Sequence, residues 1–157
     1  MHQVLDNFWS PASCFGLVEW AESQSFADKI QKPLWERGSD AMIVFEDQQL
    51  ADAMFEKIIK KLPKENSFGR LTGIDDYLRL FRFDSGLHFF NPNDLTRSRN
   101  EKIFYRVFVM LNSQSELKDF SISAASGMGI LTTNPISFQL DNKGSFFLLM
   151  ADVLYRK

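Results

Sequence analysis

The chain contains very little of what metal sites and covalent cross-links are made of. Cys14 is its single cysteine, and His2 and His88 are its only histidines in 157 residues. One cysteine excludes an intramolecular disulfide, and a structural zinc site needs four cysteine or histidine ligands where the chain has three. A catalytic site of two histidines and a carboxylate would have to include His2 from the N-terminal segment. The sequence therefore predicts no metal site and no cofactor.

Membrane-spanning runs, a signal peptide and glycosylation sites are missing as well. The longest uninterrupted apolar run, Phe146 to Ala151, has six residues, whereas a membrane-spanning helix needs roughly 18. The first ten residues lack the basic start and apolar stretch of a signal peptide, and no Asn-x-Ser/Thr sequence occurs. Together with the single cysteine, these absences predict a cytoplasmic protein that makes no membrane contact.

The composition favours one globular domain with an aromatic-rich core. The chain has 16 Phe, three Trp and three Tyr, which make up 14% of its residues. Each buried aromatic ring removes about 150–250 Å² from water, so these residues would dominate the core. A chain of this length removes roughly 70% of its unfolded surface from water when it folds as one unit. We therefore expect a single domain over residues 1–157.

Helix signals gather in the first half of the chain. Ser10 is a good N-cap for a first helix, because proline follows it at the first helical position. Asp47 caps a second helix, whose apolar residues recur at i, i+3 and i+4 until Pro63. The segment Thr72 to Phe83 also favours a helix, because it opens with a capping box and its apolar residues have helical spacing.

Strand signals dominate the second half. Ile103 to Leu111 is nearly all apolar, as expected for a central strand that is covered on both faces. Ile136 to Leu140 alternates apolar and polar residues, and turn residues 141–144 then lead into Phe146 to Tyr155, which predicts a hairpin. The predicted fold class is α+β, with a mainly helical N-terminal half and a C-terminal half that forms a mostly antiparallel sheet, helices packed on one face.

The search for catalytic patterns yields one candidate group, His88 with Asp84 and Ser85 across a predicted turn. Imidazole ionises near neutral pH, which makes histidine a common general base. Residues three and four positions apart on a strand and its turn do not normally converge into a Ser-His-Asp relay. Glycine-rich phosphate loops and the Gly-x-Ser-x-Gly motif are absent from the sequence. A structural role for His88 is therefore favoured over a catalytic one.

Surface charges supply the candidate binding residues. Four carboxylates would face a basic partner: Glu46, Asp47, Asp75 and Asp76. A basic stripe on the second helix would hold phosphates instead: Lys57, Lys60, Lys61 and Lys64. No aromatic-interleaved RNA motif accompanies these lysines, and the formal net charge of −2 disfavours nucleic acid as a partner. Another protein is therefore the predicted partner.

These observations favour a non-catalytic protein-binding or inhibitor module, comparable as a class to the bacterial immunity proteins that neutralise a toxin. Exposed aromatic residues would anchor it to its partner. Two alternatives stay open. One is a small cytosolic enzyme, a hydrolase or transferase, with a site assembled around His88. The other is a nucleic-acid-binding domain that uses the lysine-rich helix face. The sequence does not indicate an oligomeric state.

Overall fold

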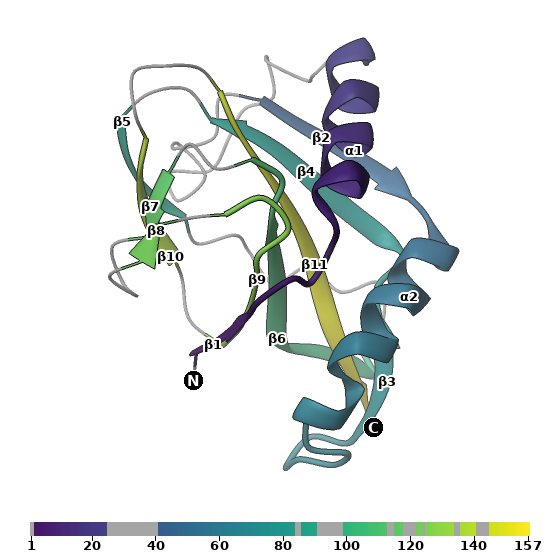
Figure 1. Cartoon of the computed structure of the whole chain (residues 1–157). Coiled ribbons are helices and arrows are strands. Elements are labelled where there is room, and N and C mark those ends of the chain that lie inside the picture. The colour runs from purple at the N-terminus through teal and green to yellow at the C-terminus, as the bar shows by residue number, and fades with distance from the viewer. Residues whose placement is uncertain are drawn as a thin grey trace.

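The computed structural model describes residues 2–24, 41–83, 86–90, 99–112, 115–117, 122–123, 125–133, 136–140 and 145–157. Within these residues, two helices lie on one side of a large antiparallel sheet and a smaller sheet lies on its other side (Figure 1). The large sheet is therefore the middle layer of the molecule.

Both helices begin where the sequence predicts. The helical elements are α1 (Pro11–Ser23), α2 (Gln48–Ile58) and the short 3-10 helix η2 (Ile59–Lys61). The hydroxyl of Ser10 accepts a hydrogen bond from the Ser13 amide at 3.2 Å, and the carboxylate of Asp47 accepts one from the Leu50 amide at 2.9 Å. These caps satisfy amides that the first helical turn leaves without a backbone partner. No helix in the described part of the chain is long and apolar enough to cross a membrane.

The large sheet has seven antiparallel strands. They are β1 (His2–Leu5), β2 (Ala41–Glu46), β3 (Arg70–Ile74), β4 (Tyr77–Phe83), β6 (Glu101–Met110), β9 (Gly129–Thr132) and β11 (Phe146–Arg156). Their order is β1-β9-β6-β11-β4-β2, and β3 pairs with the second half of β11. Strand β11 is therefore paired on both edges, with β6 on one side and with β4 and then β3 on the other.

The small sheet has four antiparallel strands in the order β5-β10-β7-β8. They are β5 (Gly86–Phe90), β7 (Ser115–Leu117), β8 (Ile122–Ser123) and β10 (Ile136–Leu140). From β4 to β11 the chain passes back and forth between the two sheets: β4, β6, β9 and β11 join the large one, and the strands between them join the small one. Eight strands shared in this way between two facing sheets form a jelly roll.

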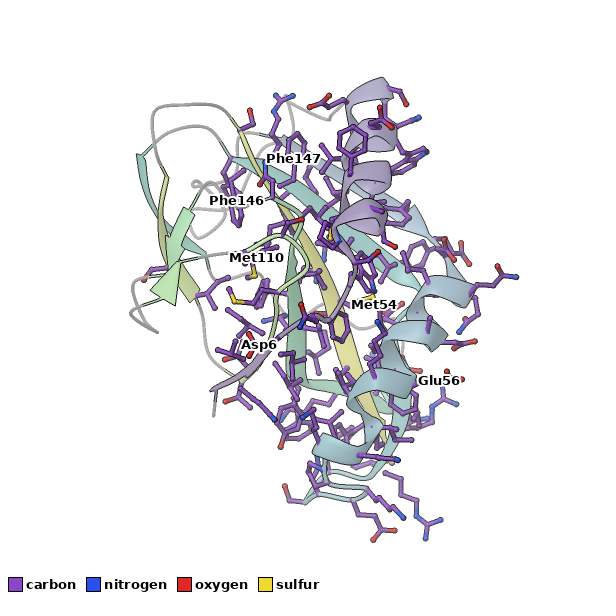
Figure 2. The ribbon with its side chains drawn as sticks, viewed as in Figure 1. Asp6, Met54, Glu56, Met110, Phe146 and Phe147 are labelled. Carbon is purple, nitrogen blue, oxygen red and sulfur yellow. The ribbon has the colours of Figure 1, made fainter. Side chains whose placement is uncertain are left out.

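The large sheet is buried on both faces, so the molecule has two core layers. Phe147 and Leu149 of β11 belong to the layer between the sheet and the helices. Phe146 of β11 and Met110 of β6 belong to the layer between the two sheets. Figure 2 shows Phe146 and Met110 on the side of the small sheet, whereas Met54 reaches from α2 toward the opposite face. Alternation along each strand therefore divides its side chains between a helix-side face and an inner face.

The segment Thr72 to Phe83 forms strands and not the predicted helix. It contains the end of β3 and all of β4, in which Leu78 and Leu80 face the helices while Phe81 and Phe83 face the small sheet. A strand that is buried on both faces shows no apolar-polar alternation, so its apolar residues can have helical spacing. The described part of the N-terminal half is therefore not mainly helical. The α+β class, the antiparallel sheet and the helices on one face are confirmed.

The predicted hairpin between Ile136 to Leu140 and Phe146 to Tyr155 is also wrong. Both strands form, but β10 pairs with β5 and β7 in the small sheet while β11 lies inside the large sheet. Turn residues indicate that the chain changes direction, and they do not indicate which sheet each strand joins. The central strand predicted over Ile103 to Leu111 is confirmed as β6, which is covered on both faces.

Candidate functional site

The inner face of the large sheet changes from apolar to charged along β11. Phe146, Leu148 and Met150 belong to the apolar layer between the sheets. Asp152 occupies the next position on the same face, because side chains alternate along a strand. Only 4% of Asp152 is exposed. A carboxylate that is buried to this extent needs hydrogen-bonding partners. The side chains that supply these partners determine the charge and the ligand-binding properties of this part of the sheet.

Two arginines from the adjacent strands hold Asp152. Nη2 of Arg79 in β4 donates to Oδ2 at 2.7 Å, and Nε of Arg106 in β6 donates to Oδ1 at 2.9 Å. The arginine side chains are 13% and 14% exposed. The strand register explains the contact, since Arg106 lies directly opposite Asp152 and Arg79 lies opposite Met150. We call Arg79, Arg106 and Asp152 the inner arginine cluster.

The row of the sheet that contains this cluster continues to the edge strand. Thr132 of β9 lies opposite Arg106 and is 1% exposed. His2 of β1 lies opposite Thr132 in the strand register. Directly opposite residues of an antiparallel pair share a face, so the hydroxyl of Thr132 joins the face that carries Arg106 and Asp152. Two guanidiniums, a carboxylate and a hydroxyl therefore meet on one part of the inner face.

The inner arginine cluster carries two positive charges and one negative charge, which favours the approach of a further anion. A guanidinium presents five N–H donors in a planar fork, and this fork matches a carboxylate through two parallel hydrogen bonds. Within the described part of the chain, Arg79 contacts Asp152 through Nη2, so its other nitrogens can still donate to a ligand. The cluster is therefore a candidate carboxylate-binding site.

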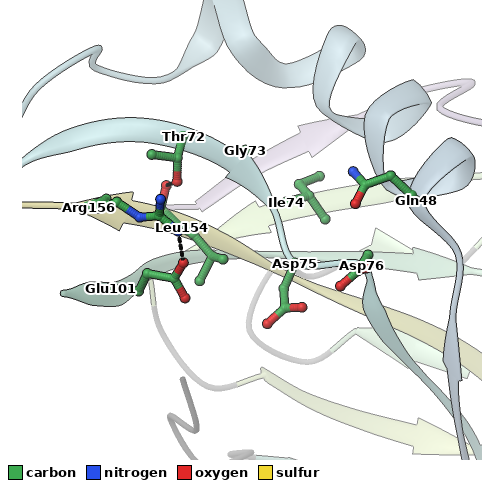
Figure 3. A pocket seen from close by; sticks show the side chains of 9 residues that line it. All are labelled: Gln48, Thr72, Gly73, Ile74, Asp75, Asp76, Glu101, Leu154 and Arg156. Atoms are coloured by element: carbon green, nitrogen blue, oxygen red, sulfur yellow. Dashed lines mark hydrogen bonds and ion pairs between the residues drawn. The ribbon is translucent and has the colours of Figure 1, made fainter. Parts of the chain in front are cut away.

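A surface pocket of about 280 Å³ contains two of the four predicted acidic binding residues (Figure 3). Asp75 and Asp76 line one side of it, and on the other side Glu101 forms an ion pair with Arg156. The carboxylate of Asp75 accepts a hydrogen bond from the Tyr77 amide at 3.0 Å, so it shapes the turn between β3 and β4. Among the described residues, no three His, Cys, Asp or Glu side chains are grouped so that they could hold a metal ion.

The other predicted binding residues do not line this pocket. Asp47 caps α2 and its amide donates to the Asp76 carbonyl at 2.9 Å, while Glu46 is exposed at the end of β2. Lys57 donates to the carbonyl oxygen of Phe8, and its ammonium lies 5.2 Å from the centre of that ring. Three more lysines are exposed beyond it: Lys60, Lys61 and Lys64. The predicted role of these acidic and basic residues in binding a partner remains a prediction.

Of the three residues in the predicted catalytic group, the structure describes only the backbone position of His88. His88 lies in β5, opposite Phe138 of β10, whereas Asp84 and Ser85 lie outside the described residues. The catalytic role of these three residues therefore stays a prediction. Cys14 is fully buried on the helix side, and burial raises the pKa of its thiol above the usual value. A buried thiol of this kind behaves as a small apolar side chain and not as a nucleophile.

Sequence reasoning missed the inner arginine cluster, although the sequence contained a signal for it. Asp152 is the one charged residue inside the apolar run Phe146 to Tyr155, and Arg106 interrupts a similar run in β6. A charge inside a strand that is covered on both faces must be buried and paired. We predicted β6 as such a strand, so asking which partner neutralises Arg106 would have led to a carboxylate on a neighbouring strand.

Solved structures match this fold over 99% of the chain. A viral collagen prolyl hydroxylase from Paramecium bursaria Chlorella virus-1, in complex with 2-oxoglutarate, matches with a TM-score of 0.63 and 12% identity, over 96% of its own chain. A prolyl 4-hydroxylase from Pseudomonas putida matches with a TM-score of 0.60 and 11% identity, over 92% of its chain. HygX from Streptomyces hygroscopicus, with nickel and 2-oxoglutarate bound, matches with 0.53 and 10%, over 83%. No family model and no curated protein sequence matches the chain.

These matches show the fold, and they correct the functional prediction. The jelly roll resembles that of 2-oxoglutarate-Fe(II) oxygenases over nearly the full chain. The prediction of a non-catalytic protein-binding inhibitor is therefore wrong, as is the expectation that the chain is not an enzyme. The enzyme alternative agrees better with the fold. Local motifs misled the prediction because a jelly roll builds its sites from strands that are distant in the sequence.

The described residues do not assemble an iron site of the kind found in oxygenases with this fold. A non-haem iron oxygenase site uses two histidines and one carboxylate. The chain has two histidines in all, so both His2 of β1 and His88 of β5 would be required. On the inner face, both oxygens of the buried carboxylate of Asp152 are already bound by guanidiniums. We therefore assign no reaction step to a metal ion.

Proposed function

We propose that this protein binds a 2-oxo acid, represented by 2-oxoglutarate, on the inner face of its large sheet. We further propose that the protein is an oxidoreductase that uses the bound acid as a substrate. The inner arginine cluster is the observation that carries the proposal, because it places two largely buried guanidiniums around a single carboxylate. The viral prolyl hydroxylase and HygX, which share the fold, have 2-oxoglutarate bound in their structures. A dicarboxylic 2-oxo acid has the charge that such a cluster selects.

Each member of the cluster has a definite part in this proposal. Arg79 forms two parallel hydrogen bonds to a carboxylate of the ligand, and Arg106 adds a second positive charge on the same face. Asp152 bridges the two guanidiniums and fixes their orientation before the ligand arrives. Because 13% of the Arg79 side chain is exposed, the ligand can reach it without separation of the strands.

The apolar residues beside the cluster strengthen this binding. Met150 lies between Arg79 of β4 and Phe108 of β6 in the register, and both Met150 and Phe108 are buried. Apolar neighbours exclude water, and charged hydrogen bonds are stronger where the local dielectric constant is low. The same residues offer contacts to the short aliphatic chain of a 2-oxo acid.

Calorimetric titration with 2-oxoglutarate tests the proposal. We expect one site with a dissociation constant between about 1 µM and 1 mM, the range of most enzyme ligands. Arg79→Met should weaken binding at least about tenfold, because it removes charged hydrogen bonds worth about 1.5–3 kcal/mol. The matched control is Arg70→Met, which removes an exposed arginine paired with Glu65 at the surface and should leave the affinity unchanged. Wild-type affinity in Arg79→Met would contradict the proposed site.

The oxidoreductase part of the proposal needs a separate measurement. Loss of the 2-oxo acid with time, in the presence of cell extract fractions that supply a second substrate, should depend on the protein. Arg79→Met should slow this loss, and Arg70→Met should not. If the acid binds but is never consumed in any fraction, the oxidoreductase assignment fails while the binding site stands.

A further inference from the structure

We infer that the 2-oxo acid is held by ion pairing with Arg79 and Arg106, and not by chelation of a metal ion. The inference rests on the proposed function and goes beyond it, since it states which chemistry holds the ligand. Chelation is the alternative to exclude, because HygX holds nickel together with 2-oxoglutarate. Three features of the inner face decide between the two modes: its charge, its remaining side chains and the positions of the two histidines.

The charge of the inner arginine cluster opposes a metal ion. The guanidinium nitrogens of Arg79 and Arg106 lie 2.7 and 2.9 Å from the two oxygens of Asp152. A divalent cation that approached this carboxylate would therefore meet two positive charges, and their repulsion is strong where water is largely excluded. The same two charges attract a carboxylate, so the cluster selects an anion.

Beside the cluster, the described inner face carries the hydroxyl of Thr132 and is otherwise apolar. Its buried layer consists of apolar side chains: Phe81, Phe83, Phe108, Met110, Met128, Ile130, Ile136, Phe146, Leu148 and Met150. Thioether sulfur suits soft metals such as Cu(I), whereas Fe(II), Mn(II) and Ni(II) are bound by imidazole and carboxylate. The methionines of this layer therefore do not replace the missing ligands.

The two histidines lie in strands of different sheets. His2 lies in β1, an edge strand of the large sheet, and His88 lies in β5, an edge strand of the small sheet. A site with two histidines and one carboxylate would need both of them together with a carboxylate that is not already shared by two arginines. Ion pairing needs only groups that are already in place.

The test compares two acids with and without a metal ion. Protein freed of metal by EDTA and then transferred to chelator-free buffer is titrated with 2-oxoglutarate and with glutarate, each alone and with saturating Mn(II). Glutarate has both carboxylates but lacks the oxo group that forms a chelate with the adjacent carboxylate. Ion pairing predicts dissociation constants within about threefold of each other for the two acids, with less than about a twofold effect of Mn(II). Arg79→Met should weaken both acids at least about tenfold.

A double histidine variant and the wild-type titrations distinguish failure of this inference from failure of the proposed function. The double variant His2→Ala/His88→Ala should bind both acids as the wild type does. Binding of 2-oxoglutarate that requires Mn(II), excludes glutarate and is lost in this double variant would overturn the inference and leave the proposed function intact. Absence of binding by the wild type in every titration would refute the proposed function and remove the inference with it. Circular dichroism checks the fold of each variant, and the wild-type titrations decide even if Arg79→Met does not fold.

Discussion

The two faces of the large sheet are filled differently, although the same strands build both. On the helix side, Phe147, Leu149 and Val153 of β11 belong to an apolar layer that includes buried residues of α1 and α2. On the inner side, Phe146 begins an apolar stretch that ends at the charged Asp152. The helix-side face is therefore apolar along the whole of β11. The inner face is apolar from Phe146 to Met150 and becomes charged at Asp152, toward the C-terminal end of the strand.

This difference separates what stabilises the fold from what can bind a ligand. Apolar burial stabilises a folded chain by about 25 cal/mol per Å² removed from water. A buried ion-pair cluster adds little, because desolvation of its charges offsets most of their attraction, and apolar replacements are often neutral or stabilising. The inner arginine cluster is therefore better explained by binding than by stability. Substitutions on the two faces should separate these two properties.

The largest loss of stability is expected for Asp152→Ala. This variant leaves the guanidiniums of Arg79 and Arg106 facing each other without the carboxylate between them, which should lower the free energy of unfolding by about 3–5 kcal/mol. Urea unfolding followed by tryptophan fluorescence measures the change. The matched control is Glu65→Ala, which removes the exposed partner of Arg70 and should cost less than about 1 kcal/mol. Equal effects of the two variants would contradict the burial of the cluster.

A similar but smaller loss is expected on the helix side from Leu149→Ala. Leu149 is fully buried, and its truncation leaves a cavity that should lower the free energy of unfolding by about 2–5 kcal/mol. The affinity for 2-oxoglutarate, measured by calorimetry on the folded protein, should not change. Val44→Ala is the control, because Val44 is 51% exposed on edge strand β2 and its truncation should cost less than about 0.5 kcal/mol. A tenfold loss of affinity in Leu149→Ala would show that the two faces cannot be separated.

Replacement of the whole cluster gives the sharpest comparison between the faces. The triple variant Arg79→Met/Arg106→Leu/Asp152→Leu should be as stable as the wild type or more stable by about 1–4 kcal/mol, as found when buried ion clusters are replaced by apolar residues. Binding of 2-oxoglutarate should be lost. Urea unfolding and calorimetry on the same preparation measure both properties. A triple variant that is much less stable would mean that the charges hold the sheet together.

Sequence patterns predicted those elements whose signals are local. Helix α2 has one apolar face and an N-cap at Asp47, and both features lie within a few residues of each other. Strand β4 is buried on both faces, so its spacing could not be distinguished from that of a helix. The assignment of β10 and β11 to different sheets depends on partners far away in the chain, and the turn between them does not encode it.

For the same reason, the sequence signals that charges are buried in β6 and β11 but does not identify the three residues that form the candidate site. Arg79 and Arg106 contact Asp152 across 73 and 46 positions of sequence, so no motif of fixed spacing connects them. Only the strand order and the register place them on one face. The predicted acidic residues Asp75 and Asp76 are neighbours in sequence, which made them easy to select and says little about a site formed by distant strands.

The smallest effect is expected from Tyr155→Phe, on the helix side of β11. The Tyr155 hydroxyl donates to the Pro63 carbonyl oxygen at 2.7 Å and so ties β11 to the segment after η2. Loss of this hydrogen bond should lower the free energy of unfolding by about 1 kcal/mol at pH 8. Burial raises the pKa of Tyr155 from 10.0 to about 12, with a smaller contribution from Tyr105. The neutral phenol is therefore the form that the folded chain favours.

This pKa shift gives the Tyr155→Phe comparison a pH dependence with a definite sign. The raised pKa means that the unfolded chain loses the phenolic proton first, at a pH near 10, while the folded chain keeps it until about pH 12. The advantage of the wild type is thus fully present below pH 10 and is lost as the pH rises from 10 toward 12. Urea unfolding of both proteins at pH 8, 10 and 11 should show the wild-type advantage shrinking and then reversing, because phenylalanine has no proton to lose and a rise of about two pKa units outweighs a hydrogen bond worth about 1 kcal/mol. A difference that stays constant over this range would mean that the Tyr155 hydroxyl is reached by water, and that the helix-side face is less completely closed than its apolar filling indicates.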